Sequence, residues 1–269
     1  MPGMRFSIQI SASGLFALLL LAGCAAPGLQ QEPGMRRPQS VTPVPSHGEI
    51  EVWRLEELVQ QDLPAVLLRN SQGIHAAIET RLLRGILGTG EKILRAAGEG
   101  PIPDFVVTPS AMVNAYAFVS DKRPTIALSL GMIRLLSNDE GAWAALFGHE
   151  LAHLRLEHLR SMQERRERTE IASSIAGVAL SVIGLPFASI ATDASAALAD
   201  RAFSRDDERE ADRTGLEYMR RAGFAETGAI SLQQRLLTVK SGTAIPFLST
   251  HPSGEERIEN LRQLIQGGN

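Results

Sequence analysis

The sequence predicts an α+β fold that is mainly helical, with a small three-stranded sheet beside one long helix. Aromatic residues make up only 5% of the chain, and Ala and Leu are abundant, which is typical of helical domains. Three short strand-like runs lie together in the middle of the chain. The 269 residues are 44% hydrophobic, enough for one sizeable core. The formal net charge of −3, without a basic stripe, argues against a nucleic-acid partner.

Residues 1–23 are predicted to be a lipoprotein signal peptide and not part of the fold. Arg5 supplies a positive charge, and residues 15–21 form an apolar run that is too short to cross a bilayer comfortably. The run ends in Leu-Ala-Gly followed by Cys24, which resembles a bacterial lipobox, so Cys24 is the predicted lipidation site. Cys24 is the only cysteine, and the domain therefore has no disulfide. An ordinary secretory signal with an incidental cysteine is the alternative.

Residues 24–48 are predicted to be a lipidated, flexible tether. They contain five prolines among Gln, Ser and Gly, a composition that cannot form a core. A tether of this length would hold the following domain about 25–30 Å from the bilayer. By resemblance to sorted lipoproteins, Ala25 after the cysteine favours the outer membrane. We therefore expect a lipid-anchored protein at the periplasmic face of the cell envelope.

Residues 49–269 are predicted to form the folded domain. Residues 49–97 have a helical pattern of apolar positions, which a stretch rich in Gly and Pro ends. Three short strands bounded by turn residues are expected next, at 105–107, 114–119 and 125–130.

A metal site is indicated by His149-Glu150-Leu151-Ala152-His153. On an α-helix, residues i and i+4 are about 40° apart and one turn above each other, so both imidazoles can hold the same metal ion. Glu150 lies at the edge of the same face, where it can reach a water at the metal without being a ligand. This H-E-x-x-H arrangement is typical of zinc hydrolases. Chance placement on an amphipathic helix is the alternative, so a third ligand is needed.

The helix that carries this motif is predicted to begin directly after Ser137, which forms an S-x-x-E capping box with Glu140. It is expected to extend to Arg165 or beyond. On a continuous helix, His158 lies half a revolution away from His149. We therefore predict that His158 faces solvent and does not join the metal.

The third ligand is predicted in residues 204–215, which contain five carboxylates. Helical phase separates them, because Glu208 and Asp212 share a face with the small residues Ala211 and Gly215, which let another helix come close. Glu208 is therefore the predicted ligand. Asp212, one turn later, is expected to accept a hydrogen bond from the ring of a ligand histidine and to fix its tautomer. A fully charged face is expected to be solvated: Glu210, Arg213, Glu217 and Arg221. The alternative is that the whole helix is solvated.

The residues after the second histidine limit the class of site. The metzincin pattern requires Gly and His at the positions where this chain has Leu156 and Leu159, so the chain does not match it. A third ligand from a downstream Glu instead makes the site gluzincin-like.

Residues 171–191 are apolar and long enough to span a membrane, but Gly184 and Pro186 divide them. We favour a helical hairpin packed over the site, and a segment that dips into the membrane is the alternative.

These motifs resemble those of zinc metallopeptidases of the CAAX prenyl protease and HtpX type, over about residues 50–267. Among them they are most similar to periplasmic lipoproteins of the β-barrel assembly-enhancing protease type. The stretch Gly131-Met132-Ile133 resembles the turn before the active helix. Thr250-His251-Pro252, followed by Arg257-Ile258, resembles a C-terminal loop whose histidine approaches the metal. One stretch resembles the edge strand that binds substrate: Asn114, Ala115, Tyr116 and Ala117.

Two departures from the family pattern stand out. The glycines expected after the edge strand are replaced by residues 120–123, Ser-Asp-Lys-Arg, and the tetratricopeptide repeats of the larger periplasmic members are not found in this chain. The shape of the turn and the means of selecting partners therefore differ from the family pattern.

The resemblance implies a zincin-like metallopeptidase domain with one Zn²⁺ per chain, held by His149, His153 and Glu208. Glu150 would act as general base in hydrolysing peptide bonds of unfolded or misassembled envelope proteins. His251 would either stabilise the oxyanion or occupy the open metal position as an inhibitory ligand. The edge strand would bind an extended substrate by main-chain pairing.

Two other functional interpretations stay open. One is a chaperone or assembly adaptor whose zinc site is structural or latent. The other is a membrane-embedded protease that uses residues 171–191.

Overall fold

The computed structural model describes residues 40–41, 44–45, 51–69, 73, 75–120, 122–164, 203–239, 245–251 and 254–267. The predicted signal peptide, Cys24, most of the tether and the apolar segment 171–191 lie outside these residues. Among the described residues, no helix is both long enough and apolar enough to span a bilayer.

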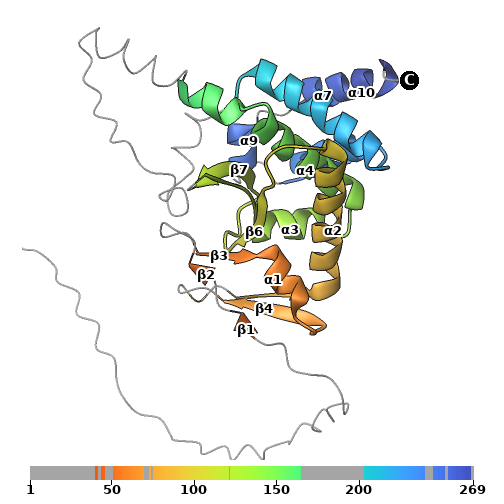
Figure 1. Ribbon diagram of the computed structural model, residues 1–269. Coiled ribbons are helices and arrows are strands. Elements are labelled where there is room, and N and C mark those ends of the chain that lie inside the picture. Colours follow the sequence, from red (N-terminus) through yellow and green to blue (C-terminus); the bar gives the residue numbers. More distant parts are fainter. Residues whose placement is uncertain are drawn as a thin grey trace, which may run out of the picture. The chain divides into compact units, whose positions relative to one another are not determined.

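The fold is α+β and mainly helical, as predicted (Figure 1). The described strands are β1 (Ser40–Val41), β2 (Val44–Pro45), β3 (Glu51–Arg54), β4 (Ala65–Arg69), β5 (His75–Glu79), β6 (Asp104–Thr108), β7 (Ala115–Ser120) and β8 (Arg123–Ser129). The described helices are α1 (Leu55–Gln60), α2 (Thr80–Ala97), α3 (Leu130–Leu136), α4 (Glu140–Arg155), α7 (Arg205–Arg221), α8 (Thr227–Leu237), α9 (Pro246–Thr250) and α10 (Glu255–Gly267).

The sheet next to the metal motif is larger than the predicted three strands. Its order is β2-β3-β6-β8-β7, in which β6 and β8 are parallel and β7 pairs antiparallel with β8. The three predicted strands are β6, β7 and β8, and β7 lies at the edge among the described strands. A second sheet has the order β1-β4-β5.

The helical prediction for residues 49–97 is correct for α1 and α2 and wrong for β3, β4 and β5. Strand β4 pairs antiparallel with β5, with Val66 opposite Ile78, and its burial alternates along the strand. Short apolar runs of this length fit a helix and a strand equally well in periodicity. Pairing with a partner distant in sequence decides between them, as it does for β3 and β6.

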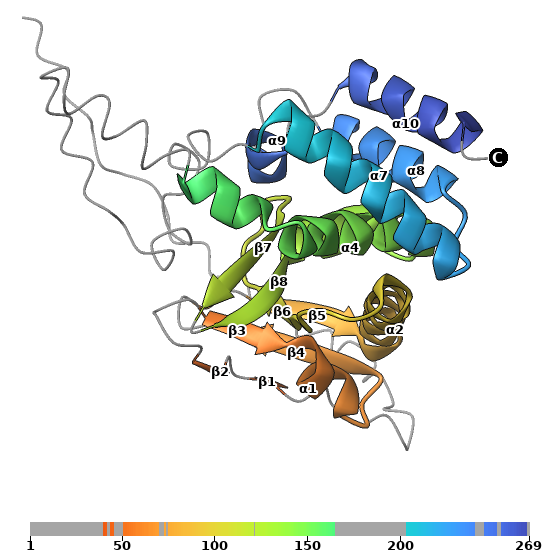
Figure 2. The same cartoon turned by 45° about the horizontal axis from the view of Figure 1, so that its top comes forward.

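Helix α4 lies in the middle of the core. Figure 2 shows it between the layer that holds β7 and β8 and the helices α7 and α8, all of which it contacts. Every residue from Ala142 to Leu154 is buried. A helix buried on all sides normally carries apolar side chains there. The exceptions in this stretch are the titratable residues of the predicted motif: His149, Glu150 and His153.

The ends of α4 differ from the prediction. Its N-cap is Asp139, whose side chain accepts a hydrogen bond from the backbone N–H of Ala142, while Ser137 ends the preceding helix. The helix ends at Arg155, and Glu157 adopts a positive φ of 55° before helical residues resume at His158. Because a left-handed residue breaks the helical phase, residues after it point in new directions.

Helices α4 and α7 are held unusually close by two glycines. A Cβ atom added to Gly148 would lie 2.9 Å from the carbonyl oxygen of Gly215, and one added to Gly215 would lie 3.0 Å from the carbonyl carbon of Gly148. Any side chain at either position would push the helices apart. The pair therefore sets the distance between the two helices that carry the predicted metal ligands.

Candidate metal centre

The two histidines of α4 point to the same side, as their spacing predicts. The Nε2 atoms of His149 and His153 are 3.1 Å apart. Both side chains are buried, with 3% of His149 and none of His153 exposed. The close contact between α4 and α7 brings a carboxylate to them: Glu208 Oε1 lies 3.2 Å from His153 Nε2, and Oε2 lies 3.5 Å from His149 Nε2.

A fourth donor comes from the residue that follows α9. His251 Nδ1 lies 3.1 Å from His149 Nε2 and 2.9 Å from Glu208 Oε1. The donor atoms of these residues all lie within 4.8 Å of one another, and all four side chains are buried: His149, His153, Glu208 and His251. Sequence spacing alone could not place His251, which is 102 residues from His149.

These residues fit a metal ion. Donors bound tetrahedrally to one ion at about 2.0–2.1 Å lie about 3.3 Å from each other. Five separations in this group run from 2.9 to 3.5 Å, and all of them lie within 4.8 Å. Imidazole nitrogens with a carboxylate oxygen are a donor set that zinc and other first-row divalent metals accept. This group of four residues is called the donor group below.

Glu150 adjoins the donor group and does not belong to it. Its side chain is 1% exposed, and its Oε1 atom has no hydrogen-bond partner among the described residues. His251 Nε2 lies 3.5 Å away, too far for a strong hydrogen bond. A buried carboxylate oxygen without a partner is costly, and it is available to accept a proton.

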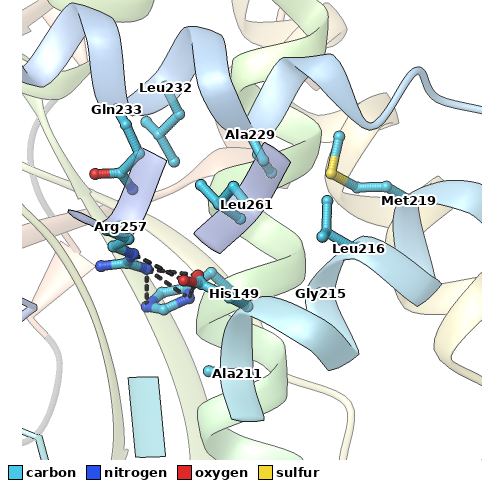
Figure 3. Close-up of a pocket in the computed structure, with 12 residues that line it drawn as sticks. His149, Ala211, Gly215, Leu216, Met219, Ala229, Leu232, Gln233, Arg257 and Leu261 are labelled. Atoms are coloured by element: carbon cyan, nitrogen blue, oxygen red, sulfur yellow. Dashed lines mark hydrogen bonds and ion pairs between the residues drawn. The ribbon is translucent and has the colours of Figure 1, made fainter. Parts of the chain in front are cut away.

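Asp212 lies where its helical phase predicts. Its Oδ1 atom is 3.0 Å from His149 Nδ1, on the opposite side of the ring from the donor group. If His149 Nδ1–H donates to this carboxylate, the lone pair of Nε2 is left for a metal. A small cavity of about 10 Å³, comparable to one water, lies beside this contact (Figure 3).

Arg257 is the residue that the sequence analysis did not assign to the site. From α10 it donates to Asp212 Oδ1 at 2.6 Å and to Glu208 Oε2 at 2.6 Å, and Figure 3 shows it against the ring of His149. Its side chain is buried. It therefore balances the charges of the two buried carboxylates of α7, Glu208 and Asp212. In the sequence, the one sign that Arg257 belongs to the site is its position after His251 in the C-terminal motif.

The charges of the donor group favour metal binding. Burial works to raise the pKa of Glu208, but His251 and then His149 lower it, so the carboxylate is ionised. Burial lowers the pKa of His153 well below its usual value, which keeps the ring neutral. Burial also works to raise the pKa of Asp212, but Arg257 and His149 bring it to about 2.

His251 differs in its electrostatics. Burial works to lower its pKa, but the carboxylates of Glu208 and Glu150 raise it above its usual value. A raised pKa favours the imidazolium form, which must lose the hydrogen on Nδ1 before that atom can bind a metal.

The predicted substrate strand corresponds to β7 and the residue before it. Ala115 and Ala117 belong to the main core cluster, while Tyr116 packs with Phe118 on the opposite face. Burial raises the pKa of Tyr116 to about 12. Asn114 is buried, and its side-chain oxygen has no hydrogen-bond partner among the described residues.

The turn after β7 forms without the usual glycines. Lys122 takes a positive φ of 65°, and Ser120 pairs with Arg123 across the hairpin. A non-glycine residue therefore makes the tight turn that the sequence left undefined.

The prediction that His158 faces solvent is wrong. Only 3% of it is exposed, and its Nδ1 atom lies 3.0 Å from Nδ1 of His153. The prediction assumed one continuous helix, whereas the left-handed Glu157 interrupts it and turns His158 toward the site. The face of α7 that was predicted to be solvated is exposed in the structure: Glu210, Arg213, Glu217 and Arg221.

Comparison with known proteins gives several relatives of this chain. The chain is 29% identical over 259 residues to a beta-barrel assembly-enhancing protease of Vibrio cholerae serotype O1, covering 93% of this chain and 51% of that protein. It is 27% identical over 158 residues to the beta-barrel assembly-enhancing protease of Escherichia coli strain K12, covering 56% of this chain and 32% of that one. It is 26% identical over 186 residues to metalloprotease YcaL of Escherichia coli strain K12, covering 66% of this chain and 69% of that protein.

The chain thus spans about half or less of the length of the two assembly-enhancing proteases, at 51% and 32%. The sequence model of "Peptidase family M48" matches residues 88–265, which include all four residues of the donor group. Because this match covers most of the chain and includes the donor group, the chain belongs to peptidase family M48.

Proposed function

We propose that this protein is a zinc-dependent metalloendopeptidase that cleaves unfolded or misassembled proteins of the cell envelope. One observation carries the proposal: a buried donor group of three histidines and a carboxylate lies beside Glu150, a buried carboxylate whose Oε1 atom has no hydrogen-bond partner among the described residues. Membership of peptidase family M48 and the names of the relatives support the same class of reaction.

His149, His153 and Glu208 would hold one zinc ion per chain, with Asp212 behind His149. A bound zinc ion would supply Lewis-acid polarisation of the scissile carbonyl and a lower pKa for a water molecule. Glu150 accepts a proton from the attacking water at Oε1. As the carbon–nitrogen bond breaks, Glu150 delivers that proton to the leaving amine.

We assign His251 the role of an inhibitory ligand that must move before substrate enters. Catalytic zinc sites keep one position open, whereas a site with four protein ligands is closed. His251 Nδ1 lies as close to His149 and Glu208 as a fourth ligand would, which supports inhibition over oxyanion stabilisation.

Strand β7 is the proposed substrate-binding edge. It contacts α4 and has an unpaired edge among the described strands, so an extended peptide can add to the sheet by main-chain hydrogen bonds. Such pairing tolerates many side chains. This supports a substrate class of unfolded segments with exposed backbone over one defined peptide.

The proposed location is the periplasmic face of the outer membrane, through a lipid on Cys24. The lipobox-like ending at Cys24 and the proline-rich stretch behind it support an anchor with a flexible tether. Two relatives are named for β-barrel assembly, which supports a role in quality control of envelope proteins.

The test uses the mature protein with casein and with a denatured outer-membrane protein as substrates. Chelation should abolish cleavage, and zinc should restore it. Glu150→Gln should lower the cleavage rate about 10²–10⁴-fold while zinc still binds. The matched control is Glu140→Gln, an exposed carboxylate on the same helix, 59% exposed, which should leave cleavage unchanged.

His251→Ala should raise the cleavage rate if His251 is inhibitory, and Glu150→Gln should abolish cleavage in that background too. A lower rate in His251→Ala would assign it to oxyanion stabilisation instead. Cleavage that persists in both Glu150→Gln proteins would rule out the proposed mechanism. Rescue of a cellular envelope defect by Glu150→Gln would favour the chaperone or adaptor interpretation.

A further inference from the structure

His158 is buried beside the donor group without belonging to it. Its ring meets that of His153 edge-on, with centroids 5.0 Å apart at an angle of 71°, and the two Nδ1 atoms are 3.0 Å apart. The turn at Glu157 aims it there. On its far side, His158 Nε2 lies 3.4 Å from Glu210 Oε2.

The hydrogen bonds that His153 requires as a buried metal ligand indicate the role of His158. His153 Nε2 faces His149 and Glu208, so it must carry the lone pair if His153 is to bind a metal. Its Nδ1 atom then carries the hydrogen and needs an acceptor, because the ring is fully buried. Phe203 stacks on one face of the ring at 3.8 Å between centroids. Among the described residues, Nδ1 of His158 is the acceptor within hydrogen-bond distance of Nδ1 of His153.

The same argument fixes which ring nitrogen of His158 carries the hydrogen. A neutral imidazole that accepts at Nδ1 carries its hydrogen on Nε2, and that hydrogen points toward Glu210. The contact with Glu210 is long, and the Glu210 side chain is 56% exposed, so it adds little. The contact that matters joins the two histidines.

We propose that His158 is a positioning residue of the metal centre, whose Nδ1 atom accepts the Nδ1–H of His153 and so presents Nε2 of His153 to the metal. His149 is oriented directly by a carboxylate, Asp212, whereas His153 is oriented by a second histidine. This inference rests on the proposed zinc site, and not on the choice of substrate or on the rate of cleavage.

The first experiment compares two variants of the mature protein in the Glu150→Gln background, so that proteolysis does not enter. In His158→Asn, the side-chain oxygen stands close to the position of Nδ1 and accepts the same hydrogen bond. His158→Leu fills similar space without an acceptor. Zinc dissociation constants are measured by competition with a chromophoric chelator, and the unfolding midpoint is measured for each metal-free protein.

We expect His158→Leu to weaken zinc binding about 10–100-fold, the usual cost of losing a partner of a ligand histidine, and His158→Asn to retain most of the affinity. Affinity retained in His158→Leu but lost in His158→Asn would mean that His158 only fills space, and equal affinities in the two variants would mean that an acceptor at this position does not matter. Either result overturns the inference. A parent protein that binds no zinc would instead overturn the proposed function.

A second measurement needs no His158 variant and applies even if His158→Leu does not fold. In ¹⁵N-labelled, zinc-loaded protein with His158 intact, imidazole NMR should show hydrogen on Nδ1 of His153 and on Nε2 of His158. Hydrogen on Nδ1 of His158 would overturn the inference, because that atom could not then accept.

Discussion

Glu150 and Glu208 are two buried carboxylates on facing helices, and their surroundings are opposite. Glu208 accepts from Arg257 at 2.6 Å and contacts His251 at 2.9 Å and His153 at 3.2 Å. Glu150 is more deeply buried, yet its Oε1 atom has no hydrogen-bond partner among the described residues. Both carboxylates face His251, which lies between them.

This difference matches the proposed roles of Glu208 as a metal ligand and Glu150 as a base. A carboxylate surrounded by cations and imidazoles stays ionised and fixed, as a metal ligand must. A buried carboxylate oxygen left without a partner carries a cost of about 1–3 kcal/mol, and proteins keep such groups mainly where chemistry uses them. The following predictions test the surroundings of these carboxylates and the helix contact that sets their distance.

The largest effect is expected from Arg257→Leu, which leaves Glu208 and Asp212 buried without their cation. Breaking a buried ion pair on one side costs about 3–5 kcal/mol, so the free energy of unfolding of the metal-free protein should fall by about that amount. Urea denaturation measures it. The control is Arg262→Ala on the same helix, whose pair with Glu259 is exposed, and its effect should stay below about 1 kcal/mol. A similar loss in both variants would contradict the assigned role of Arg257.

Next in size is the contrast between Glu208→Gln and Glu150→Gln in zinc affinity. Loss of a ligand carboxylate should weaken zinc binding more than about 100-fold, beyond the range seen when a ligand's partner is lost. Glu150→Gln should bind zinc as the wild type does. Chelator competition measures both. Comparable affinities in the two variants would remove the distinction between ligand and base.

A smaller effect is expected from Gly215→Ala, which moves the helix of Glu208 away from that of Glu150. The added Cβ would lie 3.0 Å from the backbone of Gly148, and such overpacking costs about 1–3 kcal/mol. Zinc affinity should fall as well, because Glu208 shifts relative to His149. Gly85→Ala on α2 is the control: nothing lies within 4 Å of its Cβ, and Ala there should stabilise by about 0.5–1 kcal/mol.

The last prediction concerns acid stability of the metal-free protein. The pKa of Asp212 falls from 3.8 to about 2 on folding. A depressed pKa stabilises the fold above about pH 4, and this contribution disappears as pH falls toward 2. At about 1.4 kcal/mol per pKa unit, it amounts to about 2 kcal/mol. The stability gap between wild type and Asp212→Asn, followed by urea denaturation in EDTA, should therefore close between pH 4 and 2. A gap that stays constant would show that Asp212 does not titrate in this way.

The sequence by itself determined the parts of the site that depend on helical geometry. Spacing by four residues placed His149 and His153 side by side, and helical phase selected Glu208 and Asp212 from five carboxylates. Small residues at Ala211 and Gly215 correctly indicated a close helix contact. These placements follow from spacing because a helix repeats every 3.6 residues regardless of its surroundings.

Only the tertiary structure decided the rest. The early strands β3, β4 and β5 depend on pairing between distant segments, so a local pattern could not distinguish them from helix. The structure also places two residues that spacing left unassigned. Arg257 reaches Glu208 and Asp212 from a helix 45 or more residues further along the chain. His158 turns inward because one residue, Glu157, adopts a left-handed conformation. A single backbone torsion changes the direction of every later side chain, and local sequence does not encode that choice strongly for a non-glycine residue.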